Sequence, residues 1–364
     1  MSFTSILQTN QEAVSDQPSP TTKDGSRTSV SDALLRPLHD LRISLIDRCN
    51  LRCVYCMPRE VFGPDYAFLP KSEWLDFSQI ERLARAFVTL GVRKLRLTGG
   101  EPLLRPNLPE LAVRLSKIDE VEDLAITTNG LLLAPMADEL KRSGIDRVTI
   151  SLDALDSELL GRMNGLGVPP TRVLKGIDAA IACGLSPKIN MVVQKGVNEC
   201  EILPMARYFH DRRVPLRFIE YMDVGNGQRW DRSQVVPSGD LLKLLRTEFS
   251  LDALPANALG EVARRFGNPA GDWEVGFVSS ITSPFCGSCN RARVSADGKL
   301  YTCLFATAGT DLKPILESDR DACDLEDSLA KLWVGRKDRY SELRSGKAGG
   351  DDTASRVPMS FVGG

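Results

Sequence analysis

Histidine is nearly absent from the 364-residue chain, which has only His39 and His210. Both lie among polar residues, and neither has a finger-like spacing from a cysteine motif, so we interpret them as surface or capping residues. A formal net charge of −2 excludes a protein that attracts nucleic acid through its overall charge, so anion binding would need a local cluster of cations. No apolar run approaches the thickness of a bilayer, which predicts a soluble protein without membrane contact.

The N-terminus also lacks the apolar segment of a secretory signal. Nine cysteines without such a signal favour a reducing compartment, the cytoplasm, and metal ligation rather than a disulfide framework. Residues 1–38 carry scattered acidic residues among Ser, Thr, Gln and Pro, which predicts a disordered extension.

Three cysteines stand close together in the run C-N-L-R-C-V-Y-C, and they are Cys49, Cys53 and Cys56. A structural zinc ion or iron–sulfur cluster normally takes four protein ligands. A trio with no fourth ligand nearby therefore suggests an open metal position for a substrate or cofactor. The alternative is a zinc site that a distant residue completes.

A second trio lies near the other end of the chain, formed by Cys286, Cys289 and Cys303. Its spacing also fits most of a zinc ribbon, so these residues alone leave zinc and iron–sulfur equally open. We interpret the remaining cysteines, Cys183, Cys200 and Cys323, as ordinary small side chains.

Strand-like and helix-like segments alternate along the chain, which predicts a parallel barrel or an open part of one. We expect strands at 41–46, 92–98, 123–128, 147–152, 187–193 and 215–220. The clearest helix begins at Ser78, where S-Q-I-E fits a capping box, and ends near Gly91. Beyond residue 225 we expect only helices near 238–248 and 325–334 and short apolar runs.

Alternation within these strands separates an apolar face from a cationic one. The apolar side chains, which we expect to face the helices, are Leu95, Leu97, Val148, Ile150, Ile189, Met191 and Phe218. The opposite face carries Arg42, Lys94, Arg96, Lys188, Asn190 and Arg217. A bound polyanion such as a triphosphate would neutralise five converging cations, whereas strands slipped by one residue would leave them in solvent.

The strand that ends at Thr98 continues into G-G-E-P. Glycines at the carboxyl end of a barrel strand let a ligand approach the backbone, and barrel enzymes build their sites there. The segment alone is a weak signal that also fits a simple turn. Thr127 and Ser151 occupy similar positions at the ends of the next two strands.

The first cysteine trio, with Tyr55 just before its last cysteine, resembles the cluster-binding loop of the radical S-adenosylmethionine (SAM) superfamily. The resemblance implies a [4Fe–4S] cluster whose fourth iron binds SAM, within an incomplete (β/α)6 TIM-like barrel. It assigns Gly99, Gly100 and Glu101 to the amino group of SAM, and it assigns other SAM contacts to Tyr55, Ser151 and Met222. The barrel would cover residues 39–224, followed by an auxiliary-cluster region at 225–345.

Both trios, together with Arg291, Arg293 and the terminal M-S-F-V-G-G, resemble the radical SAM family that cyclises GTP in the first step of molybdenum cofactor biosynthesis. The match covers about residues 39–364. It implies a lyase with two [4Fe–4S] clusters and SAM that converts GTP to (8S)-3′,8-cyclo-7,8-dihydroguanosine 5′-triphosphate. The implied GTP contacts are Arg42, Lys94, Arg96, Thr127, Lys188, Arg217, Arg291, Ala292 and Arg293, and the implied catalytic residues are Arg42, Arg96, Gly363 and Gly364.

The same resemblance implies a reduced electron donor, a homodimer, and a cyclic pyranopterin monophosphate synthase that uses the product. A peptide-modifying radical SAM enzyme would explain the cysteines but not the inward cations, and a non-catalytic electron-transfer protein would not explain G-G-E-P. Composition predicts a flexible tail at 346–364. The family resemblance instead favours a functional diglycine, anchored by Pro358, Phe361 and Val362.

Overall fold

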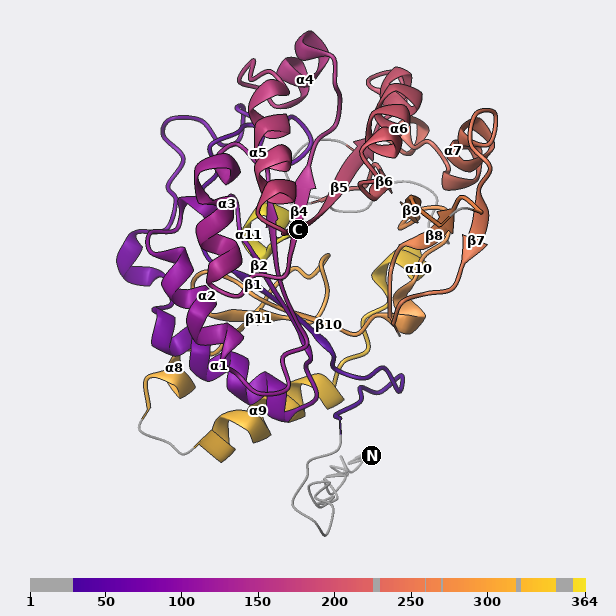
Figure 1. Ribbon diagram of the computed structural model, residues 1–364. Coiled ribbons are helices and arrows are strands. Elements are labelled where there is room, and N and C mark those ends of the chain that lie inside the picture. Colours follow the sequence, from indigo (N-terminus) through magenta and orange to yellow (C-terminus); the bar gives the residue numbers. More distant parts are fainter. Residues whose placement is uncertain (1–28, 225–229, 259, 270, 319–321, 345–355) are drawn as a thin grey trace, which may run out of the picture.

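The computed structural model describes residues 29–224, 230–258, 260–269, 271–318, 322–344 and 356–364. Six parallel strands lie side by side in chain order, and a helical segment follows each of them (Figure 1). They are β1 (Asp40–Ser44), β2 (Lys94–Thr98), β3 (Asp123–Thr128), β4 (Arg147–Ser151), β5 (Ser186–Val193) and β6 (Leu216–Glu220). The predicted (β/α)6 partial barrel is confirmed, and each predicted strand matches an observed one to within two residues at either end.

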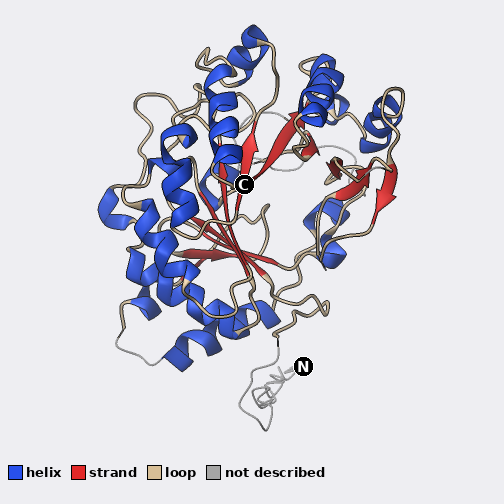
Figure 2. Ribbon diagram, viewed as in Figure 1, coloured by secondary structure: helices blue, strands red, loops and turns tan. Residues whose placement is uncertain are grey.

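Helices cover the outer face of these strands, as Figure 2 shows. They are α1 (Phe77–Thr89), α2 (Leu108–Ser116), α3 (Leu133–Arg142), α4 (Ser157–Met163), α5 (Thr171–Ala182), α6 (Ile202–Asp211) and α7 (Ser238–Leu245). The seven side chains predicted to face the helices are all buried in the core, so the predicted strand parity is confirmed. The predicted capping box is wrong by two residues, because Asp76 caps α1 and pairs reciprocally with Gln79.

The C-terminal region extends the same sheet at both of its edges, so the two regions share one twelve-stranded sheet. Strand β9 pairs in parallel with β6, and β10 pairs in parallel with β1. The strands of this region are β7 (Asp252–Leu254), β8 (Arg264–Gly267), β9 (Glu274–Val278), β10 (Arg291–Val294), β11 (Lys299–Tyr301) and β12 (Thr310–Asp311). Its helices are α8 (Lys313–Leu316), α9 (Ala322–Val334) and α10 (Tyr340–Arg344), and α9 packs against α1.

The predicted range of disorder, residues 1–38, extends too far along the chain. Residues 29–38 are ordered, and Val30 and Leu38 belong to the hydrophobic core. Asp32 and Arg36 are also buried and form an ion pair with an Nε–Oδ2 distance of 2.6 Å. The segment therefore belongs to the folded protein, while residues 1–28 lie outside the described residues.

The last nine residues are docked on the barrel. Met359 donates its backbone N–H to the carbonyl of Val224 at 2.9 Å, and helix α11 (Met359–Val362) contacts β1. Val362 is only 1 % exposed. The chain thus ends in the middle of the molecule, over the strands (Figure 1). The flexible tail predicted for 346–364 is corrected for residues 356–364, and residues 346–355 lie outside the described residues.

Among the helices of the described residues, none is long and apolar enough to cross a membrane.

Candidate active site

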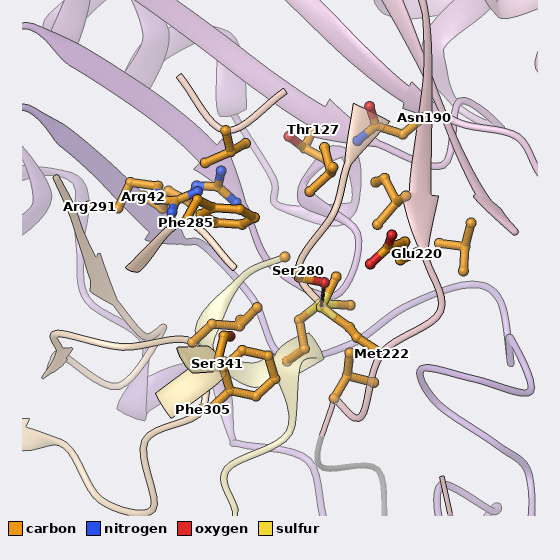
Figure 3. Close-up of a pocket in the computed structure, with 18 of the residues that line it drawn as sticks. Arg42, Thr127, Asn190, Glu220, Met222, Ser280, Phe285, Arg291, Phe305 and Ser341 are labelled. Carbon is orange, nitrogen blue, oxygen red and sulfur yellow. Dashed lines mark hydrogen bonds between the residues drawn. The ribbon is translucent and has the colours of Figure 1, made fainter. Parts of the chain in front are cut away.

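A cavity opens at the carboxyl ends of the barrel strands, and parts of both chain regions line it. Figure 3 shows Arg42 and Arg291 beside Phe285 on one side, with Thr127 and Asn190 opposite and Ser280 and Met222 below both groups. All three cysteines of the second trio line this cavity, and so do Tyr55, from the first trio's loop, and Gly364, at the chain end. The site therefore connects the two cysteine motifs with the tail.

Three arginines form a belt across adjacent strands inside the barrel. Arg42 on β1 is in register with Arg96 on β2 and with Arg293 on β10. The Nε atoms of Arg42 and Arg96 are buried and have no hydrogen-bond partner among the residues that the structure describes. Burial and mutual repulsion lower the pKa of Arg42 and of Arg293, the latter to about 10. The belt thus has unused donors and excess positive charge, which an anionic ligand would satisfy.

Two threonines orient Arg96 within this belt. Its Nη1 atom donates to Thr127 Oγ1 at 3.1 Å and to Thr149 Oγ1 at 3.0 Å. These residues lie in register on β3 and β4 and line the cavity. Because the two hydroxyls hold one side of the guanidinium, the rotamer of Arg96 is fixed before a ligand binds.

The other predicted cations lie deeper in the lumen and are partly neutralised there. The Lys188 Nζ and Glu274 Oε1 atoms are 3.9 Å apart, and Arg217 Nη2 lies 3.6 Å from Glu261 Oε1. Lys94 starts β2, in register with Asp40. The expectation of five uncompensated cations is therefore wrong for the lower lumen. Burial and Arg217 still lower the pKa of Lys188 to about 8, so Glu274 and Glu261 offset the neighbouring positive charge only in part.

Ala292 does not face the cavity. It lies between Arg291 and Arg293 on β10, so alternation directs its side chain to the opposite face, where it is fully buried in the core. The prediction that Ala292 contacts the substrate is therefore wrong for its side chain. Arg291 and Arg293 do line the cavity.

The three cysteines of the first trio are half-buried. Burial raises the pKa of Cys49 to about 11 and that of Cys56 to about 12. It also raises the pKa of Cys53 well above its ordinary value, with the neighbouring thiols adding to the shift. Thiolates at these positions need positive charge from a bound metal, so the three thiols fit an iron cluster. Tyr55 donates its hydroxyl hydrogen to Asp153 Oδ2 at 2.7 Å and so connects this loop to the end of β4.

Gly99 and Gly100 pack directly against the backbone that leads into the first cysteine trio, so no open space is left beside them. A side chain at Gly100 would place its Cβ 2.3 Å from the Arg48 carbonyl oxygen, and one at Gly99 would lie 2.5 Å from that of Ile46. Glu101 is buried, accepts hydrogen bonds from Thr128 and from the backbone of Leu103, and does not line the cavity. The sequence predicts that a ligand approaches the backbone of these glycines. Backbone from the loop that carries the first trio fills that space instead.

The second trio lies in a cationic setting. Burial alone would raise the pKa of Cys289, but Arg291 and Arg336 outweigh it and lower that pKa to about 6. Each guanidinium places an Nη2 donor 3.2 Å from Cys289 Sγ. Sequence reasoning missed Arg336, which lies just after α9 and far from any motif.

No three His, Cys, Asp or Glu side chains in the described ranges lie close enough to hold a single metal ion. A cubane cluster differs in this respect, because each thiolate binds a different iron atom. The two half-buried thiol trios match that kind of ligand set.

The chain end completes the cavity wall. Gly363 adopts φ +81° and accepts a hydrogen bond from Arg293 at its carbonyl, next to Thr98 at the end of β2. Gly364 lines the cavity. The predicted approach of the diglycine to the site is therefore observed, and Val362 anchors it as predicted.

Comparison with known proteins agrees with this arrangement. The model of the radical SAM superfamily matches residues 43–209, and the model described as Molybdenum Cofactor Synthesis C matches residues 214–342. The solved structure of Streptococcus suis SuiB has a similar fold, with a TM-score of 0.53 and 16% identity, covering 90% of this chain and 72% of its own. Fold and sequence together define a radical SAM protein.

Two curated relatives narrow this class. A GTP 3′,8-cyclase of Staphylococcus haemolyticus is 43% identical over 336 residues, and one of Acidothermus cellulolyticus is 46% identical over 358 residues. Each alignment covers 92% of this chain and 99% of the relative. The chain belongs to the GTP 3′,8-cyclase family.

Proposed function

We infer that the chain is a SAM-dependent radical GTP 3′,8-cyclase that carries two [4Fe–4S] clusters and acts in molybdenum cofactor biosynthesis. One observation carries this conclusion: a cavity bounded by the second cysteine trio, the loop of the first trio and a belt of under-satisfied arginines. When bound, the first cluster and SAM supply a carbon radical that removes a hydrogen atom from the substrate. The protein must hold GTP in one orientation and keep water from the reacting atoms.

We assign the triphosphate of GTP to the arginine belt and the lower lumen. Arg42, Arg96 and Arg293 offer charge-assisted hydrogen bonds from three neighbouring strands, and Thr127 and Thr149 pre-orient Arg96. Lys94, Lys188 and Arg217 extend the positive field below the belt. A ligand with several negative charges benefits most from such an arrangement, because its binding relieves the repulsion among buried cations.

We assign the purine to the second trio and SAM to the first. Arg291 stacks over Phe285 at 5.1 Å beside the second trio, which provides a flat, partly apolar wall. Tyr55, Ser151 and Met222 line the cavity on the side of the first loop and are the proposed SAM contacts. Gly99, Gly100 and Glu101 support the SAM site by positioning this loop. The backbone N–H groups of Gly100 and Glu101 already donate to Ile46 and Arg48, so the carbonyls of the two glycines are the candidate direct contacts.

The carbonyl of Gly363 engages Arg293, so the tail and the substrate share one guanidinium. In our proposal the docked diglycine fixes the orientation of Arg293 and thereby the position of the ribose relative to SAM. A reduced electron donor, a homodimer, a cytoplasmic location and a downstream cyclic pyranopterin monophosphate synthase complete the proposal by family resemblance.

Anaerobic reconstitution with iron and sulfide, followed by incubation with GTP, SAM and dithionite, tests the function. We expect equimolar 5′-deoxyadenosine and a cyclised nucleotide with the mass of GTP, separable by chromatography. ATP in place of GTP serves as the matched control, because it keeps the triphosphate and changes the base. SAM cleavage without a GTP-derived product would contradict the proposed function.

A further inference from the structure

A buried ion triad, formed by Asp32, Arg36 and Arg336, lies next to the second cysteine trio. Asp32 accepts from Arg36 Nε at 2.6 Å and from Arg336 Nη1 at 3.2 Å, both at its Oδ2 atom. All three side chains are at most 2 % exposed. Trp333 stacks on the Arg336 guanidinium at 4.5 Å and donates its indole N–H to the Arg36 carbonyl at 3.2 Å. The triad is therefore rigid and shielded from water.

The triad contacts the chain at each of the three cysteines. Arg36 Nη1 donates to the carbonyl of Cys286 at 2.8 Å. Arg336 donates from Nη1 to the carbonyl of Cys289 at 2.7 Å and from Nε to the carbonyl of Thr302, next to Cys303, at 3.0 Å. Desolvating one carboxylate and two guanidinium groups is costly, and plain packing of this region would not require it. The arrangement indicates a need for positive charge at this place.

Arg336 also reaches a sulfur atom. Its Nη2 atom lies 3.2 Å from Cys289 Sγ. A positively charged donor that does not line the cavity thus donates a hydrogen bond to the sulfur of a proposed cluster ligand. In the first trio, Cys49 Sγ is approached by neutral donors, the backbone N–H of Leu51 at 3.4 Å and Asn129 Nδ2 at 3.7 Å. Hydrogen bonds and positive charge at the sulfur ligands stabilise the reduced form of an iron–sulfur centre and raise its reduction potential.

We propose that Arg336, held by Asp32 and Trp333, is a positioning residue that raises the reduction potential of the metal centre bound by Cys286, Cys289 and Cys303. The proposal rests on the proposed function only in taking that centre to be a [4Fe–4S] cluster. Arg336 does not line the cavity, so its effect reaches the substrate only through the cluster. Both trios consist of cysteines, but Arg336 gives the second trio a positively charged donor, whereas the donors at Cys49 are neutral.

The test measures a potential rather than turnover. In the full chain with Cys49, Cys53 and Cys56 changed to Ala, only the second cluster remains, and its midpoint potential is obtained by an anaerobic redox titration followed by electron paramagnetic resonance. We expect Arg336→Gln to lower the potential by at least about 59 mV, a tenfold change in the equilibrium of a one-electron couple. Iron analysis of the unchanged chain checks the cluster assignment separately.

Arg105→Gln is the matched control. Arg105 also stacks on a tryptophan, Trp74 at 4.8 Å, and donates to two backbone carbonyls, but it contacts no cysteine. We expect the control to keep the parental potential. If Arg336→Gln loses its iron, Arg336→Lys, which retains a charge but not the fork of donors, is titrated instead and should also show a lowered potential. A parental potential in whichever variant keeps its iron would overturn the proposal. Loss of iron from both variants would overturn it as well, because Arg336 would then be needed to hold the cluster and not to set its potential.

Discussion

Gly363→Ala is the substitution that most sharply separates the docked tail from a frayed terminus. Gly363 has φ +81° and ψ 116°, a conformation that side-chain-bearing residues rarely adopt and that costs them about 1–3 kcal/mol. In addition, the new Cβ would lie 2.2 Å from Thr98 Cγ2, a contact that cannot persist. Since about 1.4 kcal/mol corresponds to a factor of ten, the docked population should fall at least tenfold.

The assay is the initial rate of cyclised product from GTP at saturating SAM, measured beside GTP affinity and iron content. We expect the rate to drop at least about tenfold, in proportion to the docked population, with iron content unchanged and GTP affinity close to parental. Gly364→Ala is the comparison, because its Cβ would meet only the flexible Met359 side chain at 3.3 Å and should cost less. The double variant Gly363→Ala with Thr98→Ser removes the clashing methyl group and should recover part of the rate. A parental rate in Gly363→Ala would refute the role of the docked tail.

Three further predictions concern the metal centres and the arginine belt. First, because two separate trios each hold a cluster, anaerobic reconstitution should give about eight irons per chain, and stoichiometric zinc at the second trio would contradict this assignment. Second, Cys289→Ser should retain some reductive SAM cleavage but abolish cyclisation, whereas Cys53→Ser should abolish both; equal loss of SAM cleavage in both variants would rule out separate roles. Third, Arg96→Ala should weaken GTP binding by about 10- to 100-fold, the effect of a charge-assisted hydrogen bond of about 1.5–3 kcal/mol, and should leave SAM binding nearly unchanged. Calorimetry beside the exposed control Arg142→Ala measures this, and parental GTP affinity in Arg96→Ala would argue against the triphosphate assignment.

The sequence predicts the barrel well because its strands obey local rules. Apolar residues such as Leu95 and Ile189 alternate with Arg96 and Lys188, so parity alone assigns each side chain to the helices or to the lumen. The same rule identifies Ala292 as a core residue, and its assignment to the substrate came from family resemblance instead. Parity therefore corrects the resemblance at this position.

The sequence does not reveal contacts that depend on long-range pairing. Glu261 and Glu274 partly neutralise Arg217 and Lys188, yet they lie in a region where no strands were predicted. The overall composition of residues 1–38, rich in Ser, Thr, Gln and Pro, predicts disorder for Asp32 and Arg36 as well, although their spacing of four residues is a weak local signal of an ion pair. Arg336 lies 47 residues from Cys289, and the tertiary fold, in which α9 packs against α1, brings the two together.

Hydrogen transfer from substrate to cofactor tests the central claim most directly. The purified, reconstituted chain is incubated anaerobically with SAM, dithionite and GTP that carries deuterium at C3′, and the 5′-deoxyadenosine is analysed by mass spectrometry. A radical GTP 3′,8-cyclase predicts one deuterium in the 5′-deoxyadenosine together with a cyclised nucleotide. Unlabelled 5′-deoxyadenosine formed beside unchanged GTP would contradict the account.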